Sequence, residues 1–357
     1  MLTDVRSLTD GQPGAILGVG HTELGEQYRF DNRRFILNPE KVPGALSPLG
    51  RRQLFIDLSL GATQSEEELV ALADQKFIAT TGIRSRYIFD GPVAELAAMA
   101  GRQALRAAQV EASEIDAVIV GSNTGSGYPS TADRVKVALG IPSTALSFDV
   151  QEACPVGAIA VELAWKLIRG RFHRRVLVIG AEKATTLASP DDYKGANLFG
   201  DAAFAFVLGA STADDFIFFE SGSDPYDDKA EYITRTKDGF SQNGRAVHKY
   251  VGTVIPDLLG RTFERLRLDP ATVHHFFPHQ PSAKTLDFLV DNLKGRWPTF
   301  NPVIHRNVEE MGNTSGACTG WMISRAKAQG QLKPGEFCLV ATFGSGMSWG
   351  LYGFIVR

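Results

Sequence analysis

Cys154 is the residue whose type and position most directly suggest chemistry. It stands just before an apolar stretch, AIAVELAWKLI, that predicts a buried helix. A thiol at a helix N-terminus has a lowered pKa, because the positive end of the helix dipole stabilises the thiolate. Such a thiolate would be a nucleophile beside backbone N–H groups that can bind an oxyanion. The alternative is a small buried cysteine of the hydrophobic core.

His279 and Asn313 occupy similar junctions in the second half of the sequence. His279 follows an apolar strand in HHFFPHQPS, and Asn313 stands in MGNTSGA before a predicted helix. A structural histidine and a helix N-cap are the alternatives for these two residues. The glycine-rich segment FGSGMSW at 343–349 predicts a turn between strands and lacks the lysine of a phosphate-binding loop. The order Cys, His, Asn across two halves of a chain suggests one catalytic constellation.

Strands that alternate with helices must position these residues, which predicts an α/β layered fold. Strands are expected at 15–19, 117–120, 176–179, 204–208, 274–277, 337–341 and 352–356, and helices at 66–74, 94–108, 132–139, 158–169, 244–266 and 314–328. The order helix, glycine, strand, turn, strand occurs twice, so we expect two similar halves, 1–210 and 211–357. Gly170 and Gly330 are the expected left-handed helix C-caps. Glu162 and Lys166, spaced i,i+4, are expected to pair.

Residues 21–65 differ from the rest, because they are polar, rich in arginine and interrupted by glycine and proline. They predict a surface insertion, with a disordered loop as the alternative.

Composition excludes several classes of protein. A net charge of −3 argues against a general nucleic-acid binder. The three cysteines form no CxxC pair, which argues against a disulfide scaffold and a structural zinc site. No apolar run has the length of a signal peptide core or a membrane span. We therefore expect a cytoplasmic protein that does not bind membranes.

Several motifs together resemble β-ketoacyl-acyl-carrier-protein synthase III, of the thiolase superfamily. They are DVxxAC at 149–154, LFGDAA at 198–203, PHQ at 278–280, GNTS at 312–315 and FGSGMSWG at 343–350. TGIR at 81–84 and GRAVHK at 244–249 match further family segments, and the resemblance covers 15–357 apart from the insertion. It implies a thiolase-like fold, in which two pseudo-symmetric αβ halves form five layers with buried central helices, and a homodimer.

The resemblance also implies a mechanism without a metal or a redox cofactor. Cys154 would accept an acyl group from a thioester of coenzyme A or of the phosphopantetheine of an acyl-carrier protein. His279 and Asn313 would stabilise the enolate that forms when a malonyl-type thioester loses CO₂, and this carbanion would attack the acyl-Cys. The backbone N–H groups of Cys154 and Ser345 would form the oxyanion hole. Transfer of the acyl group to an oxygen or nitrogen nucleophile, without decarboxylation, is the alternative.

Further residues fall at substrate positions of the family. Those expected to contact substrate are Tyr128, Val156, Gln242, His248, Ser282, Gly344 and Gly346, and those expected to dock phosphopantetheine or the carrier protein are Arg84, Lys249 and Lys284. The sequence departs from the family at Pro155–Val156, where a small residue and glycine are usual, and at Ser282, where asparagine is usual. Lys76 and Thr80 replace the family's adenine-binding Trp and Arg. The insertion and the altered adenine contacts suggest a specialised fatty-acid or polyketide pathway, and the asparagine lost at Ser282 keeps the transfer alternative open.

Overall fold

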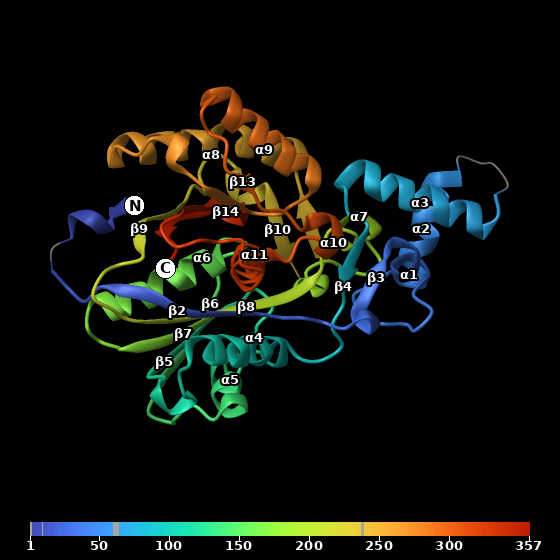
Figure 1. Cartoon of the computed structure of the whole chain (residues 1–357). Helices are drawn as coiled ribbons and strands as arrows, with labels where there is room; N and C mark the ends of the chain where they lie inside the picture. Colours follow the sequence, from blue (N-terminus) through green and yellow to red (C-terminus); the bar gives the residue numbers. More distant parts are fainter. Residues whose placement is uncertain (1, 9, 60–63, 237–238) are drawn as a thin grey trace.

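Two mixed β-sheets lie between three layers of helices in the computed structural model, which describes residues 2–8, 10–59, 64–236 and 239–357 (Figure 1). The first sheet has the order β2-β8-β7-β5-β6, with β2 (Gly14–His21), β5 (Ala117–Gly121), β6 (Leu146–Val150), β7 (Arg175–Lys183) and β8 (Asp201–Ala210). The second has the order β1-β9-β15-β14-β12-β13, with β1 (Leu2–Asp4), β9 (Phe216–Ser223), β12 (His275–Pro278), β13 (Val303–Ile304), β14 (Phe337–Gly344) and β15 (Ser348–Ile355).

The two sheets repeat one pairing pattern. In the first, β5 is parallel to β6 and β7, while β8 is antiparallel to β7 and β2. In the second, β12 is parallel to β13 and β14, while β15 is antiparallel to β14 and β9. The predicted boundary at residue 210 does not hold for the N-terminal strand, because β1 pairs with β9 and lies in the second sheet.

Helices fill the middle layer and cover both outer faces (Figure 1). The central helices are α6 (Val156–Arg169) and α11 (Cys318–Ala328); the outer ones are α4 (Val93–Ala108) and α5 (Thr131–Leu139) on one face and α8 (Gly244–Leu266) and α9 (Ala283–Arg296) on the other. One hydrophobic core joins the central helices to both sheets, for example where Trp165 contacts Phe219. The five-layer thiolase-like architecture expected from the sequence is therefore confirmed.

Two local details of the central helices are as predicted and one is not. Glu162 and Lys166 form the predicted ion pair, at 2.7 Å. Gly330 is left-handed, with φ of 67°, but Gly170 is not, with φ of −73°. Arg171, with φ of 60°, adopts the left-handed conformation after α6 instead. The glycine at 170 is therefore not a left-handed C-cap.

The insertion is ordered over its described residues and has a core of its own. It contains β3 (Arg29–Asp31), which pairs with β4 (Ser85–Tyr87), and the helices α1 (Asn32–Leu37) and α2 (Pro48–Ser59), which lie beside α3 (Glu66–Thr81) (Figure 1). Phe35 and Leu54 are fully buried and belong to one cluster with Phe77 and Tyr193. The expectation of a purely surface segment was wrong, because these spaced apolar residues pack against α3. Residues 60–63 lie outside the described ranges.

Short elements complete the chain. They are η1 (Val5–Ser7), η2 (Glu26–Tyr28), η3 (Ala112–Glu114), η4 (Ala184–Thr186), α7 (Tyr193–Ala196), η5 (Lys229–Glu231), β10 (Ile233–Thr236), β11 (Gly239–Gln242), η6 (Pro270–Thr272), α10 (Val308–Met311), η7 (Ser315–Ala317) and η8 (Ser345–Met347). Among the described residues, no helix combines the length and the hydropathy needed to cross a membrane.

Candidate active site

Cys154 lies in the connection between β6 and α6, where the backbone turns sharply. The preceding residue, Ala153, has φ of 43°, and α6 begins only at Val156, with Pro155 as its N-cap. Burial raises the pKa of the Cys154 thiol to about 12, although a hydrogen bond from Ser315 acts in the opposite direction. The lowered pKa expected from the helix dipole was therefore wrong, because Cys154 precedes the first turn and loss of solvation outweighs the favourable contacts.

His279 follows the last residue of β12 and is held from both sides. Its backbone N–H donates to the carbonyl of Ala341 on β14 (2.8 Å), and its Nδ1 lies 3.2 Å from the sulfur of Cys318. Burial lowers the pKa of His279 to about 3, so the imidazole is neutral at physiological pH. Because Nδ1 is occupied by Cys318, Nε2 is the ring nitrogen left for substrate.

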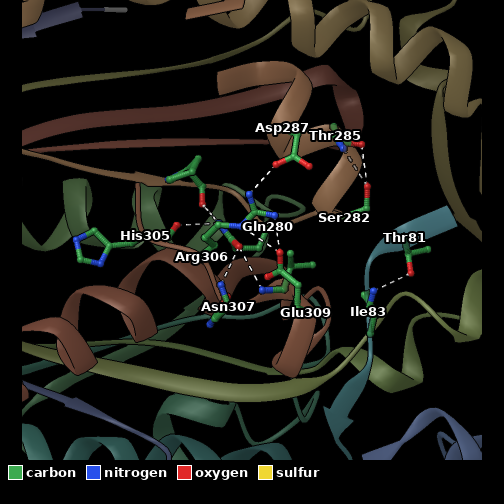
Figure 2. Close-up of polar contacts among 12 residues, drawn as sticks. Thr81, Ile83, Gln280, Ser282, Thr285, Asp287, His305, Arg306, Asn307 and Glu309 are labelled. Carbon is green, nitrogen blue, oxygen red and sulfur yellow. Dashed lines mark hydrogen bonds and ion pairs between the residues drawn. The ribbon is translucent and has the colours of Figure 1, made fainter. Parts of the chain in front are cut away.

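Gln280 fixes the peptide after His279. Its Nε2 donates to the carbonyls of Pro278 (2.9 Å) and His305 (3.3 Å), and its Oε1 accepts from the backbone N–H of Asn307 (3.1 Å) (Figure 2). Ser282 then caps α9 by accepting from the N–H of Thr285 (3.2 Å), as Figure 2 also shows. The sequence PHQPS thus rigidly joins a strand end to a helix start.

Asn313 lies opposite these residues, in the connection between α10 and η7. Its backbone N–H donates to the carbonyl of Leu198 (2.8 Å), and its carbonyl accepts from Gly200 (3.2 Å). Its Oδ1 accepts from the N–H of Ser315 (2.9 Å). The side chain therefore closes a local turn and does not cap α11, which begins at Cys318.

A cavity of about 330 Å³ brings the three predicted catalytic residues together. Cys154, His279 and Asn313 all line it, although they come from different layers and both sheets. Apolar and polar side chains share its wall, including Gln151, Leu198, Phe199, Thr234, Arg235, Phe240, Val247 and Phe343. A second hollow is lined by His21 and Trp321 among others. None of the three predicted catalytic residues is among the described residues that line it. The cavity of about 330 Å³ is therefore the candidate active site.

The glycine-rich turn between β14 and β15 approaches Cys154 very closely. A Cβ atom placed on Gly344 would lie 2.7 Å from the backbone nitrogen of Cys154 and 2.8 Å from Cδ of Pro155. A real Cβ essentially never makes contacts this short. Only glycine therefore leaves space before the Cys154 N–H, and Ser345 follows on the cavity wall.

A buried carboxylate lies behind the nucleophile. Glu182, at the end of β7, is fully buried and accepts hydrogen bonds from Asn123 and from the hydroxyl of Thr124 (2.9 Å). Burial raises the pKa of Glu182 to about 7. Its charge also raises the pKa of the Cys154 thiol, so the two groups are close enough to interact.

The other predicted contact residues divide into two groups. Gln242, Ser282 and Gly344 line the cavity, as does Ser345 of the expected oxyanion hole.

The remaining predicted residues do not line the cavity. Val156 is completely buried, and its side chain faces Gly316. Tyr128 is fully exposed, and His248 is an exposed residue that stacks on Phe288 with 3.9 Å between ring centroids. Four further predicted residues are not among the described residues that line the cavity: Gly346, Arg84, Lys249 and Lys284. The last three have exposed side chains. The roles assigned to all of these residues stay predictions.

Several residues at the site had no signal in the sequence on their own. Asn123, Glu182 and Cys318 carry no motif. Cys318 is buried, and its sulfur also contacts His279. Ser315 stands inside GNTS, so the motif included it without assigning it a role. The described residues contain no group of three His, Cys, Asp or Glu side chains that could hold a metal ion.

Comparisons with known proteins identify the family. The family model of 3-oxoacyl-[acyl-carrier-protein (ACP)] synthase III matches residues 148–225. The model of the C-terminal part of 3-oxoacyl-[acyl-carrier-protein (ACP)] synthase III matches residues 263–354. A β-ketoacyl-[acyl-carrier-protein] synthase III of Brucella suis is 31% identical over 299 residues, which cover 80% of this chain and 91% of the relative. The chain belongs to the β-ketoacyl-acyl-carrier-protein synthase III family.

Solved structures of a synthase III and of a priming β-ketosynthase share the fold along nearly the whole chain. That of Pseudomonas aeruginosa PAO1 has a TM-score of 0.76 and 25% identity, and covers 97% of this chain and 100% of its own. The priming β-ketosynthase of the R1128 polyketide biosynthetic pathway has a TM-score of 0.78 and 25% identity, with 98% of both chains covered. The chain therefore keeps the architecture of these structures along nearly its whole length, the insertion included.

Proposed function

We propose that this synthase III family member forms an acyl thioester on Cys154 and condenses it with a malonyl-type thioester. The observation that carries the proposal is the single cavity that holds Cys154, His279 and Asn313 beside the close approach of Gly344 to the Cys154 N–H. In the first step, the thiol of Cys154 attacks a thioester carbonyl. Its proton leaves with the released thiol, and the backbone N–H groups of Cys154 and Ser345 stabilise the tetrahedral oxyanion.

The second step uses neutral donors. Nε2–H of His279 and the side-chain amide of Asn313 bind the carbonyl oxygen of the malonyl thioester. Loss of CO₂ leaves its electron pair on the α-carbon as an enolate, so no base is needed to remove a proton. The carbanion attacks the acyl carbon, the bond to Cys154 sulfur breaks, and the thiolate takes up one proton. The low pKa of His279 supports this role, because a neutral imidazole does not give its proton to the carbanion.

We extend the proposal to the substrates and the assembly. The acyl donor is a thioester of coenzyme A or of an acyl-carrier protein, and the exposed Arg84, Lys249 and Lys284 would attract its phosphate. The enzyme acts as a cytoplasmic homodimer in a specialised fatty-acid or polyketide pathway, without a metal or a redox cofactor. In the part of the chain that the structure describes, β6 is an edge strand of the first sheet, and Tyr128 is fully exposed; both support pairing of two copies on this side.

Two measurements test the function. Mass spectrometry after incubation with acyl thioesters should show one acyl adduct on Cys154 in the wild type and none in Cys154→Ala. Labelled malonyl-carrier protein or malonyl-coenzyme A should then release CO₂ and give a β-ketoacyl thioester. His279→Ala should keep the adduct and lose the CO₂ release, because only the second step needs the imidazole.

The same assay separates condensation from simple acyl transfer. If the acylated enzyme turns over with an alcohol or amine and releases no CO₂ from either malonyl donor, the condensation assignment is wrong and the transfer alternative holds. An acyl adduct that persists in Cys154→Ala would instead remove the nucleophile assignment itself.

A further inference from the structure

We propose that the Ser315 hydroxyl is a catalytic hydrogen-bond donor to the sulfur of Cys154, and that Asn123 and Glu182 position it. The inference rests on the proposed function only in taking Cys154 as the nucleophile. The Oγ of Ser315 lies 3.7 Å from Sγ of Cys154, within hydrogen-bond range for sulfur. Ser315 is almost completely buried and also lines the cavity.

The direction of this hydrogen bond follows from the group on the other side of Ser315. The Nδ2 of Asn123 lies 3.3 Å from Ser315 Oγ and can only donate. Nδ2 has two hydrogens and three acceptors within range, so the contact with Ser315, the longest of the three, receives at most a shared hydrogen. Because Nδ2 cannot accept, the single O–H of Ser315 points away from Asn123, and Sγ of Cys154 is the acceptor that it contacts. The same Nδ2 donates to the carbonyl of Ala153 (2.7 Å), the residue before the nucleophile.

Glu182 decides which way the Asn123 amide points. The backbone N–H of Asn123 donates to both carboxylate oxygens of Glu182 (3.2 and 3.1 Å), and Nδ2 donates to one of them (2.7 Å). A flipped amide would place Oδ1 against the carbonyl oxygen of Ala153 as well as against a carboxylate oxygen, and two acceptors repel each other. The buried carboxylate therefore fixes a donor next to Ser315, and a backbone hydrogen bond from Gly316 ties it to the same turn.

The backbone of Ser315 is held in an unfavourable conformation. Its φ of 48° lies in the left-handed region, which non-glycine residues rarely adopt. Its N–H is bound by Oδ1 of Asn313, and a Cβ on the next residue, Gly316, would lie 2.3 Å from Val156. Such strain persists where the surroundings force it, and it is concentrated at functional sites. Here it directs a hydroxyl at the reacting sulfur.

A donor at this position acts whenever negative charge develops on the sulfur. The thiol loses its proton when it attacks the donor thioester, and the thiolate is the leaving group when the β-ketoacyl product forms. A hydrogen bond to a charged group is stronger than one to a neutral group. Ser315 therefore stabilises the thiolate more than the thiol or the acyl-Cys.

The test is the pH dependence of Cys154 alkylation by iodoacetamide, which needs neither malonyl substrate nor decarboxylation. Ser315→Ala removes the hydroxyl. Ser315→Gly also removes the hydroxyl, and glycine adopts the positive φ of this position without strain. One variant therefore remains informative if the other folds poorly. We expect both variants to alkylate about tenfold more slowly at a fixed pH below the thiol pKa, with the profile moved upward by about one pH unit. Ser324→Ala is the matched control, because this buried serine of α11 bonds His21 instead of Cys154.

Profiles that coincide with the wild type in both Ser315 variants would overturn the proposal. So would an equal slowing in Ser324→Ala, since the effect would then be structural. Failure of the proposed function is seen separately: a wild type that forms an adduct but releases no CO₂ contradicts condensation and leaves the alkylation result intact.

Discussion

Replacing Gly344 by alanine tests the oxyanion hole most directly. The backbone at Gly344 is extended, with φ of −165°, so alanine adds no conformational strain and only needs space. Its Cβ would lie 2.7 Å from the Cys154 nitrogen, whereas an ordinary contact begins at 3.4 Å. The turn and Cys154 must therefore separate by about 0.7 Å, the difference between these two distances.

That separation is large compared with the tolerance of an oxyanion hole. Donors act at 2.7–3.1 Å from the oxyanion, and loss of one donor costs about 10²–10³-fold in rate. We expect Gly344→Ala to slow formation of acyl-Cys154 by about this factor, measured by rapid quenching and mass spectrometry with acyl-coenzyme A and acyl-carrier-protein donors. Alkylation by iodoacetamide should change much less, because it forms no oxyanion.

A second glycine supplies the control for this experiment. Gly295 lies in α9, and a Cβ there would meet no atom within 4 Å. Gly295→Ala should keep the wild-type acylation rate and gain up to about 1 kcal/mol of stability from helix propensity. If Gly344→Ala folds and acylates within threefold of the wild type, the close approach does not form the oxyanion hole and the reasoning fails.

Two further predictions concern stability. Burial raises the pKa of Glu182 from 4.5 to about 7, so the folded state binds its proton more tightly than the unfolded chain. The resulting stability is complete below pH 4.5 and is lost as the pH rises through 7, by about 3 kcal/mol in all. Urea unfolding of Glu182→Gln should therefore show a smaller decline between pH 5 and 7.5 than the wild type, and parallel curves would contradict the assigned burial. In the insertion, Phe35 is fully buried beside Phe77 and Arg86. Phe35→Ala should cost about 3–5 kcal/mol and speed hydrogen exchange in α1 and α2 more than in α6; equal protection everywhere would show that the insertion has no core of its own.

Much of the fold was predictable because its signals are local and periodic. The apolar stretch after Cys154 predicted a buried helix, and α6 fills the centre of the molecule. The repeated order of helix, strand, turn and strand predicted two similar halves, and the two sheets have matching pairing patterns. The arginines and prolines of the insertion concealed its core, because its buried apolar residues stand between them without a sustained helix or strand period; they are Phe30, Phe35, Ile36, Ala45, Leu46 and Leu54.

The sequence by itself determined which residues could react and the order in which they occur. Cys154, His279 and Asn313 each stand at the end of a regular element, where local patterns are readable. Only the tertiary structure decided their electrostatic state. Burial makes His279 neutral and raises the pKa of the thiol. The cavity that holds both residues is lined by segments from both sheets. The contacts of Ser315 with Cys154, and of Asn123 with Glu182, join residues 161 and 59 positions apart. No local pattern encodes such contacts: that of Asn123 with Glu182 exists only once the first half has folded, and that of Ser315 with Cys154 only once the two halves have packed together.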